Sequence, residues 1–436
     1  MQGSHGHKGL GIDRVQNLWS TLRPPGPLAR NTLLLTTGIG MRALLQALVF
    51  IVVARVLGPN GYGSFIAVLA IASILAPLVG AGGHVLLARD ISRDPASFRL
   101  AWGTALALLI ISLPVIGILY LLLAFLLLGS HLWLPILLIG VAELVFWPLA
   151  NVCAYAYQGF ERMGRMSRLL LVPVAMRALA AIILLIMHTL GGIDDTVELW
   201  AFLYMLAAAI AAVVAQSHVR HDLGIPRVPG ASHLRTGFGD GAPFVVSGFS
   251  QRMYSDADKV MLTSMVSPSV AGLYSAGHRF VDLSQIPLYG LLNALTPRLF
   301  RSGTGGPAQP LRLLLKAAPW PAAYLILVAA ALWLAAPLVT VVLGNAYEET
   351  IPVIRWMSLL PLFSLPRWLL HYALATSGLQ RIAMNCFIAA AAANVLLNLW
   401  WIPMYGWHGA LTATYVSELL AALLMLSYLA SARRRD

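Results

Sequence analysis

The sequence has little charge and almost no cysteine. Of its 436 residues, 11% are charged, and the two cysteines are Cys153 and Cys386. A soluble domain usually carries about 25% charged residues, so this composition excludes an ordinary water-soluble enzyme. Both cysteines lie in apolar stretches far apart in the chain, which excludes a disulfide framework and a cysteine metal site.

Motifs of well-known enzyme classes are also missing. The chain has no G-x-x-x-x-G-K-[ST] sequence and therefore no ATPase of its own, and it has neither H-E-x-x-H nor G-x-S-x-G. Asp256-Ala-Asp258 matches the short D-x-D of sugar-nucleotide transferases. That motif requires a soluble nucleotide-binding fold, and the apolar runs leave too few residues for such a domain. We expect a non-enzyme without cofactor or metal.

Apolar residues make up 59% of the chain and form long runs. A membrane crossing needs about 20 apolar residues, so the length allows about a dozen crossings with short loops. We predict an all-α polytopic membrane protein with about twelve spans. They are expected near 31–54, 62–88, 100–128, 132–157, 169–190, 197–217, 239–266, 270–297, 312–343, 350–376, 382–402 and 408–430.

Basic residues orient these spans. The chain carries 29 Lys and Arg against 17 Asp and Glu. If the N-terminus is cytoplasmic, 21 of the 29 fall in the two tails and in the loops on the same side. Membrane proteins keep such an excess in cytoplasmic loops, so we expect both termini inside and no nucleic-acid partner.

The longest break between runs, His218–Thr236, divides the spans six and six. We read no removable signal peptide at the N-terminus, and expect a short interfacial helix over Val15–Leu22. The predicted organisation is a cytoplasmic tail (1–30), an N-lobe (31–217), a cytoplasmic linker (218–238), a C-lobe (239–430) and a basic cytoplasmic C-terminus (431–436).

The two halves carry similar turns. An exterior turn with Arg55, Gly58, Pro59 and Tyr62 follows the first run, and a turn over Pro268–Ser275 follows the seventh. In addition, one arginine precedes a turn glycine by a similar interval in each half. The pairs are Arg42 with Gly61, 19 residues apart, and Arg252 with Gly272, 20 residues apart. Two lobes related by an internal repeat are a common plan of secondary transporters.

Twelve charged residues fall inside the predicted spans, and each costs about 2.5–3.5 kcal/mol at a helix centre. They must pair with one another or line a wet cavity. The excess of basic over acidic residues favours anions, and arginine suits phosphate because its planar fork binds two oxygens at once. They are Arg42, Arg177, Arg252, Lys259, Arg279, Arg355 and Arg367, with Glu143, Asp256, Asp258, Asp282 and Glu418.

Structural explanations compete with this one. Arg279 and Asp282 are three residues apart and could pair within one helix. Arg252, Asp256 and Lys259 could likewise form a self-neutralising ladder, whereas a functional aspartate there would bind Na⁺ or H⁺. Arg42 has no acidic residue in its own span, which favours a ligand-binding role.

Several segments together resemble one family. They are 55–63, 82–89, 258–262, 270–276, Ile286-Pro287, Thr296-Pro297 and 402–410. In order and spacing they are similar to the polysaccharide (O-antigen and exopolysaccharide) flippases of the multidrug/oligosaccharidyl-lipid/polysaccharide exporter superfamily. The resemblance covers about residues 31–430.

This resemblance implies a flippase in the bacterial inner membrane. It would move undecaprenyl-pyrophosphate-linked oligosaccharide from the inner to the outer leaflet, by alternating access through a cationic cavity between two lobes arranged as a V. It also implies Arg42 and Arg252 as matched cavity arginines, with Arg279 opposite. The expected partners are the lipid-linked oligosaccharide, membrane lipids, a polysaccharide polymerase and glycosyltransferases.

The expected site follows from both lines of reasoning. We assign Arg42, Arg252, Arg279 and Arg367 to the phosphates, Arg177, Lys259 and Arg355 to the cavity wall, and ion coupling to Asp256, Asp258, Glu418 or Glu143. A multidrug or organic-cation antiporter is an alternative, but its cavity should be acidic or aromatic, and the net positive charge of the spans speaks against it. A lipid II flippase is another, although the chain lacks that group's two extra helices. A membrane-embedded glycosyl- or phospho-transferase has no supporting motif.

Overall fold

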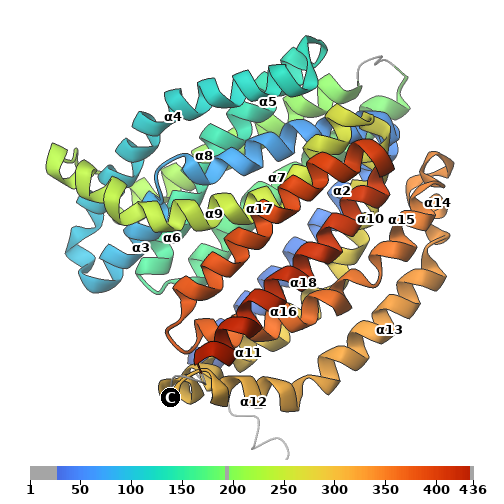
Figure 1. Cartoon of the computed structure of the whole chain (residues 1–436). Coiled ribbons are helices and arrows are strands. Elements are labelled where there is room, and N and C mark those ends of the chain that lie inside the picture. The colour runs from blue at the N-terminus through green and yellow to red at the C-terminus, as the bar shows by residue number, and fades with distance from the viewer. Residues whose placement is uncertain (1–26, 192–195, 433–436) are drawn as a thin grey trace, which may run out of the picture.

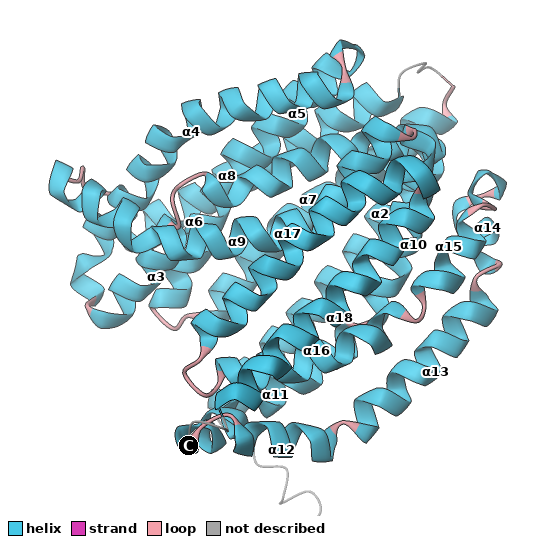
Figure 2. Ribbon diagram, in the orientation of Figure 1, coloured by secondary structure: helices cyan, strands magenta, loops and turns pink. Residues whose placement is uncertain are grey.

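The computed structural model describes residues 27–191 and 196–432, which form helices and no strand (Figures 1 and 2). The predicted helix Val15–Leu22 and the basic residues 433–435 lie outside these ranges. In the N-terminal half the helices are α2 (Pro27–Leu75), α3 (Gly83–Arg93), α4 (Phe98–Leu128), α5 (Trp133–Val141), α6 (Trp147–Gly159), α7 (Met163–Thr189) and α8 (Thr196–Leu223).

The C-terminal half is also helical, and three of its predicted spans are divided into two or three shorter helices. Its helices are α9 (Ala231–Met265), α10 (Pro268–Ser284), α11 (Ile286–Ser302), α12 (Ala308–Ala317), α13 (Pro319–Ala335), α14 (Leu338–Leu343), α15 (Thr350–Met357), α16 (Leu360–Ala375), α17 (Gln380–Tyr405) and α18 (Trp407–Ala432). Every predicted span coincides with one helix or with consecutive pieces. Seven helices of the described chain are long and apolar enough to cross a membrane, or up to eight if one bent pair counts as a span. The all-α polytopic prediction is confirmed.

Glycine and proline create the breaks. Gly58 divides α2, because its φ of 65° and ψ of 175° lie outside the helical region, and only glycine adopts such angles easily. A second break, at Ala76–Gly82, separates α2 from α3. There Gly80 and Gly82 have positive φ, and the Gly80 amide donates to Ser112 Oγ at 2.8 Å. The second predicted span is therefore a broken helix.

The linker between the halves is shorter than 218–238. Helix α8 continues to Leu223 and α9 begins at Ala231. Both ends of the expected linker are thus helical and belong to the neighbouring helices. The remaining segment is held to the N-terminal half by the amide of Arg227, which donates to the carbonyl of Arg99 at 2.8 Å.

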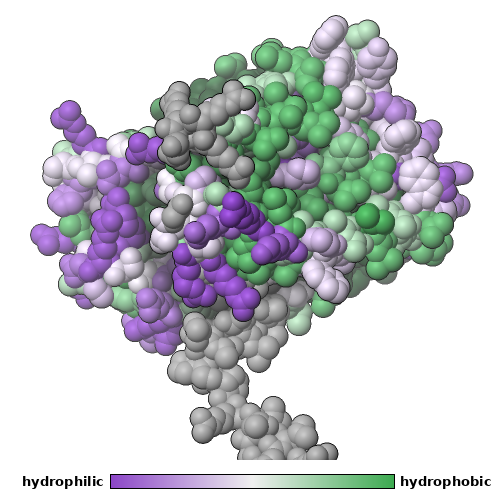
Figure 3. Space-filling view, turned by 60° about the horizontal axis from the view of Figure 1, so that its bottom comes forward, coloured by the Kyte–Doolittle hydropathy of each residue, from purple (hydrophilic) through white to green (hydrophobic). Residues whose placement is uncertain are grey.

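The outer surface is apolar along the middle of the molecule. On α4, five large side chains are between 63% and 75% exposed, namely Ile110, Val115, Ile118, Leu122 and Leu126. Figure 3 shows an apolar region between more hydrophilic ones. Apolar side chains outside and charged side chains inside are what a lipid environment requires. The chain is a multi-pass membrane protein.

The two ends of the bundle carry different residues. We call the end that carries Arg93, Arg162 and Arg227 the basic end, and the end that carries Gly58 and Val266 the turn end. At the turn end, the two similar turns pack on each other. A Cβ on Gly63 would lie 1.7 Å from the carbonyl oxygen of Pro268, and a Cβ on Gly272 would lie 2.0 Å from that of Pro59. We call this the turn-end contact.

The turn-end contact is reciprocal, because each glycine follows its proline by four residues and faces the other proline. Such an exchange is what two related repeats produce around a pseudo-two-fold axis. Gly63 is thus the residue that corresponds to Gly272. The pairing of Gly61 with Gly272 that the sequence suggests is wrong by two residues. Gly61 instead faces Val197, whose Cγ2 would lie 3.0 Å from an added Cβ.

Candidate functional site

A cavity of about 390 Å³ lies between α2 and α7 on one side and α9 and α10 on the other. We call it the charged chamber. Five basic and three acidic side chains line it, so with neutral histidine it has an excess of two positive charges. They are Arg42, Arg177, Arg252, Lys259 and Arg279, with Glu143, Asp256 and Asp282.

Arg177 is neutralised at the N-lobe wall. Its Nη2 lies 2.7 Å from Glu143 Oε1, which also accepts from Tyr204 Oη at 2.5 Å. The guanidinium lies 4.2 Å from the centre of the Tyr204 ring. Glu143 is placed by a π-helical turn over Ala142–Phe146, a feature that is frequent at functional sites. Arg177 thus has a carboxylate partner, while its Nε is buried and makes no hydrogen bond among the described residues.

The charges of α9 form a ladder. Asp256 lies 3.0 Å from Lys259 Nζ and 3.7 Å from Arg252 Nη1. Asp258 accepts from Tyr274 Oη at 2.8 Å and lies 3.7 Å from Lys259 Nζ. The one-turn spacing along the helix thus brings these groups together, while Asp258 points away from the charged chamber into the protein.

Three arginines of the charged chamber have no carboxylate within hydrogen-bond distance among the described residues. Within the described residues, neither Arg42 nor Arg279 has an acidic group within 4.0 Å, and Arg252 has Asp256 only at the longer distance and is 55% exposed. The expected alternative of an Arg279–Asp282 pair is not formed, because Asp282 Oδ1 lies 3.2 Å from His278 Nδ1 instead. Arg279 lies beside the Tyr62 hydroxyl.

The remaining predicted residues lie elsewhere. Arg367 Nε lies 2.5 Å from Glu418 Oε2, and Tyr254 Oη donates to Glu418 Oε1 at 2.8 Å. This buried cluster joins α16, α18 and α9. Arg355 lies over the Trp333 ring, 5.8 Å from its centre. Neither arginine is among the described residues that line the charged chamber, and Arg55 is exposed at the turn end.

Two further cavities adjoin the charged chamber. The apolar chamber, about 260 Å³, shares the charged residues Arg177, Arg279 and Asp282 with it, together with Gln46, Ile66, Leu69, Val174 and Tyr204. Its other described lining residues are apolar or aromatic side chains of α2, α8, α10 and α11. The neutral chamber, about 430 Å³, shares other residues with it. These are Ser73, Glu143, Trp147 and Arg252.

Sequence reasoning missed several lining residues. Gln46 follows Arg42 by one helical turn, and Trp147 and Asn151 follow Glu143 at steps of four. Residues four apart share a helix face, so a search for polar partners at that spacing from each intramembrane charge would have found them.

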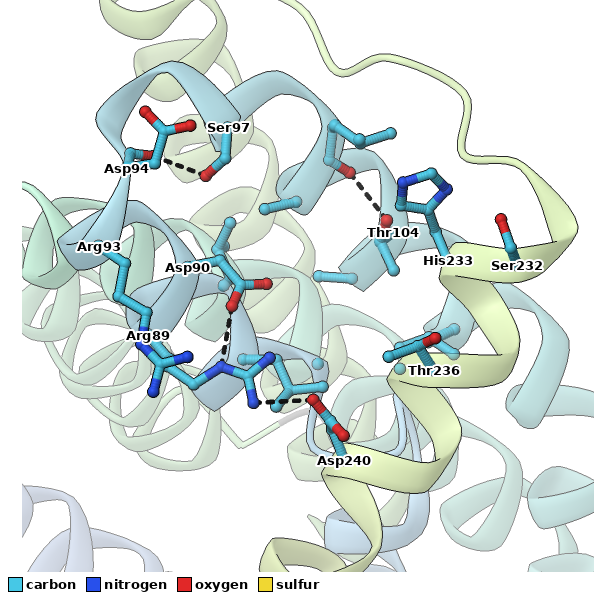
Figure 4. A pocket seen from close by; sticks show the side chains of 18 residues that line it. Arg89, Asp90, Arg93, Asp94, Ser97, Thr104, Ser232, His233, Thr236 and Asp240 are labelled. Carbon is cyan, nitrogen blue, oxygen red and sulfur yellow. Dashed lines mark hydrogen bonds and ion pairs between the residues drawn. The ribbon is translucent and has the colours of Figure 1, made fainter.

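The basic end has its own contact between the halves. An added Cβ on Gly241 would lie 1.8 Å from the carbonyl oxygen of Ala81. Nearby, Arg89 binds Asp90 at 2.8 Å and, across to α9, Asp240 at 2.9 Å (Figure 4). Hydrogen bonds to Asp90 and Asp240 raise the pKa of Arg89. Arg89, Asp90 and Asp240 also line a pocket of about 460 Å³, which is distinct from the three chambers.

Comparisons with known proteins agree on the fold. The family model described as polysaccharide biosynthesis protein matches residues 28–302. Among curated proteins, none matches the sequence. An inward-facing multidrug-resistance transporter of the MATE family, in the MOP superfamily, is 15% identical over 92% of this chain and 99% of its own, with a TM-score of 0.71.

Two other solved structures are similar. The lipid II flippase MurJ, in an inward closed conformation, is 12% identical over 91% of this chain and 87% of its own, with a TM-score of 0.71. A MOP-superfamily transporter from Pyrococcus furiosus, described by the reverse polarity of its binding pocket, is 16% identical over 93% and 95%, with a TM-score of 0.60. At such identities the likeness shows a shared fold of two lobes.

Proposed function

We propose a function from a plain premise: the chain belongs to the polysaccharide biosynthesis protein family. It has the fold of MOP-superfamily transporters. Within that class, the substrate we propose is an oligosaccharide joined through pyrophosphate to undecaprenol. The protein would move it from the inner to the outer leaflet of a bacterial inner membrane by alternating access, without catalysing a reaction.

The observation that carries this proposal is the set of three available arginines in the charged chamber. Arg42, Arg252 and Arg279 come from three different helices. Among the described residues, Arg42 and Arg279 have no carboxylate within 4.0 Å, and Arg252 has only Asp256, at 3.7 Å. A diphosphate would supply the missing negative charge. Guanidinium groups bind phosphate oxygens in pairs, and a low-dielectric surrounding strengthens each contact.

The chamber next to it suits the lipid. The apolar chamber is lined by Val49 and Phe50 of α2 and by Leu283 and Ile286 at the junction of α10 and α11. The polyprenyl tail would lie on this side and stay in the bilayer while the polar part crosses. The basic end would face the cytoplasm, because basic loops stay inside.

We propose Asp256 as the carboxylate that binds a coupling ion. Its Oδ1 lies 3.0 Å from Lys259 Nζ, but its Oδ2 is buried, has no hydrogen-bond partner among the described residues and lies 3.7 Å from Arg252 Nη1. By contrast, Glu143 and Glu418 each bind an arginine at 2.7 Å or less and also accept from a tyrosine hydroxyl. Transport by Asp256→Asn, measured with imposed Na⁺ and pH gradients, tests this. Gradient-dependent transport at the wild-type rate would exclude Asp256.

A lipid II flippase is the second candidate, because the fold matches MurJ as well as it matches a multidrug transporter and lipid II also carries a diphosphate. The excess positive charge of the charged chamber does not favour an organic cation. Charge alone therefore separates diphosphate lipids from cationic drugs, but it does not separate one diphosphate lipid from another.

Transport in proteoliposomes tests the proposal. Purified protein is reconstituted with labelled undecaprenyl-pyrophosphate oligosaccharide, lipid II or a cationic dye, and exposure on the far leaflet is followed. We expect exposure of the oligosaccharide lipid. Arg42→Ala or Arg279→Ala should weaken it about 10- to 150-fold, because a charged hydrogen bond contributes about 1.5–3 kcal/mol.

The matched control is Arg381→Ala, which removes an exposed arginine at the start of α17. Its transport should equal that of the wild type. Transport of lipid II alone would favour the second candidate, and export of the dye without any lipid exposure would refute both.

A further inference from the structure

We infer that the neutral chamber binds the sugars nearest to the diphosphate and thereby selects the glycan. The inference rests on the proposed function and adds to it a glycan subsite with named residues. It begins from the order of the three chambers. The charged chamber shares lining residues with both of the others, whereas the apolar and neutral chambers have no described lining residue in common.

The order of the chambers is therefore apolar, charged, neutral. A lipid-linked oligosaccharide has the matching order of polyprenyl chain, diphosphate and sugar. With the diphosphate at Arg42 and Arg279, the first sugar would pass Arg252 and Trp147, which line both the charged and the neutral chamber. The substrate can occupy all three chambers only in this direction, because the reverse would place the polyprenyl chain among polar groups.

The neutral chamber has the chemistry that sugars require. Apart from the residues it shares with the charged chamber, none of its described lining residues is Asp, Glu, Lys or Arg. The unshared polar and aromatic residues include His84, Asn151, Tyr155 and Gln251. A sugar is an uncharged polyol with apolar C–H faces. Amides both donate and accept hydrogen bonds, and an aromatic ring offers an apolar face with a polar edge.

Helix α6 presents these groups as a stripe. Trp147, Asn151 and Tyr155 are spaced by four residues and continue the line from Glu143, so they lie on one helix face. The Tyr155 ring is held edge-to-face against His84, with the ring centres 4.7 Å apart. The stripe thus leads from the charged chamber into the neutral one.

Helix α9 forms the opposite wall with Phe244, Ser247, Gly248 and Gln251. Within the described residues, the side chains of Asn151 and Gln251 make no hydrogen bond of 3.5 Å or less, although both line the chamber. Asn151 is half-buried and Gln251 is exposed, so a molecule in the chamber can reach both amides. Two amides that lack protein partners on opposite walls are therefore available to the hydroxyls of a sugar between them.

Binding to purified wild-type protein and variants tests the inference. The probes are undecaprenyl diphosphate and the same lipid carrying either N-acetylglucosamine or galactose. We expect at least one sugar-bearing lipid to bind the wild type more tightly than undecaprenyl diphosphate does. Asn151→Ala and Gln251→Ala should each weaken that lipid about fivefold, the loss of one hydrogen bond, and leave undecaprenyl diphosphate unchanged.

Three controls make the result specific. Gln380→Ala, at an exposed position of α17, should change nothing. Tyr155→Phe keeps the ring and should act less strongly than Tyr155→Ala. Arg252→Ala should weaken all diphosphate lipids together, because it acts on the charged part.

The outcomes separate the two proposals. If the wild type binds no diphosphate lipid, the flippase proposal fails and this inference fails with it. If undecaprenyl diphosphate binds but neither sugar adds affinity, the glycan subsite is refuted while the flippase proposal stands. Variants at Asn151 and Gln251 that weaken all three probes equally would also refute the subsite, since they would then act on folding or on the diphosphate.

Discussion

Replacing Gly272 by alanine should open the turn end of the molecule. In the turn-end contact, the new Cβ would lie 2.0 Å from the carbonyl oxygen of Pro59. Ordinary contact with a Cβ begins at 3.4 Å, so α10 and the second stretch of α2 must move apart by about 1.4 Å, the difference between these distances. Both contact atoms are rigid, because one is a Cβ and the other belongs to the backbone of a helix.

The size of the effect follows from the cost of overpacking. Inserting a methyl group into a well-packed contact costs about 1–3 kcal/mol. If the cost falls only on the state in which the turn end is closed, the ratio of open to closed molecules rises about 5- to 150-fold. Gly63→Ala should act in the same direction. The double variant should add little, because one separation of the helices relieves both clashes.

Distances between spin labels measure this opening. Labels at cysteines that replace Asn60 and Val266, in a protein whose native Cys153 and Cys386 are alanine, report on the two sides of the turn-end contact. We expect a longer and broader distance distribution in Gly272→Ala. Gly40→Ala and Gly290→Ala are the controls, because an added Cβ there meets no atom within 4 Å. An unchanged distribution in a folded Gly272→Ala protein would refute the reasoning.

Two other variants probe ion pairs of opposite kinds. Asp240→Asn removes the partly exposed ion pair with Arg89 across the basic-end contact. The ratio of open to closed molecules at this end should change by less than about fivefold, the equivalent of 1 kcal/mol. Distances between spin labels on α3 and α9 measure this ratio, and a larger change would mean that the pair holds this end closed. Glu418→Gln leaves Arg367 without its buried carboxylate and should cost about 3–5 kcal/mol of stability, seen as a lower Tm. Combining Glu418→Leu with Arg367→Met should restore most of it, and a double variant as unstable as the single one would contradict this account.

The sequence predicts the helices well because the membrane imposes a simple rule. Every segment that crosses must be apolar and must satisfy its own backbone, so apolar runs and Gly/Pro breaks mark the spans. The departures are local. Residues 76–82 lie inside the predicted span 62–88, but they interrupt its helix, and Ser112 satisfies the Gly80 amide that the break leaves free.

The roles of the intramembrane charges are harder to predict, because a role depends on contacts between distant segments. Arg42 and Arg367 look alike in the sequence, as each is an arginine in an apolar span. In the structure, Arg367 pairs with Glu418, which lies 51 residues further along the chain, whereas Arg42 has no carboxylate within 4.0 Å among the residues that the structure describes. Spacing along one helix predicts the Arg252–Asp256–Lys259 ladder, yet it also favours an Arg279–Asp282 pair that His278 replaces.

What distinguishes a binding arginine from a structural one is therefore the absence of a nearby carboxylate, and this has a thermodynamic consequence. An arginine already matched by Glu143 or Glu418 can bind an anion only by giving up its partner, and a buried partner left unmatched costs several kcal/mol. Arg42 and Arg279 pay no such penalty. Of the seven basic residues inside the predicted spans, these two should thus dominate anion binding, with Arg252 next, because it gives up only a long contact in a site open to water.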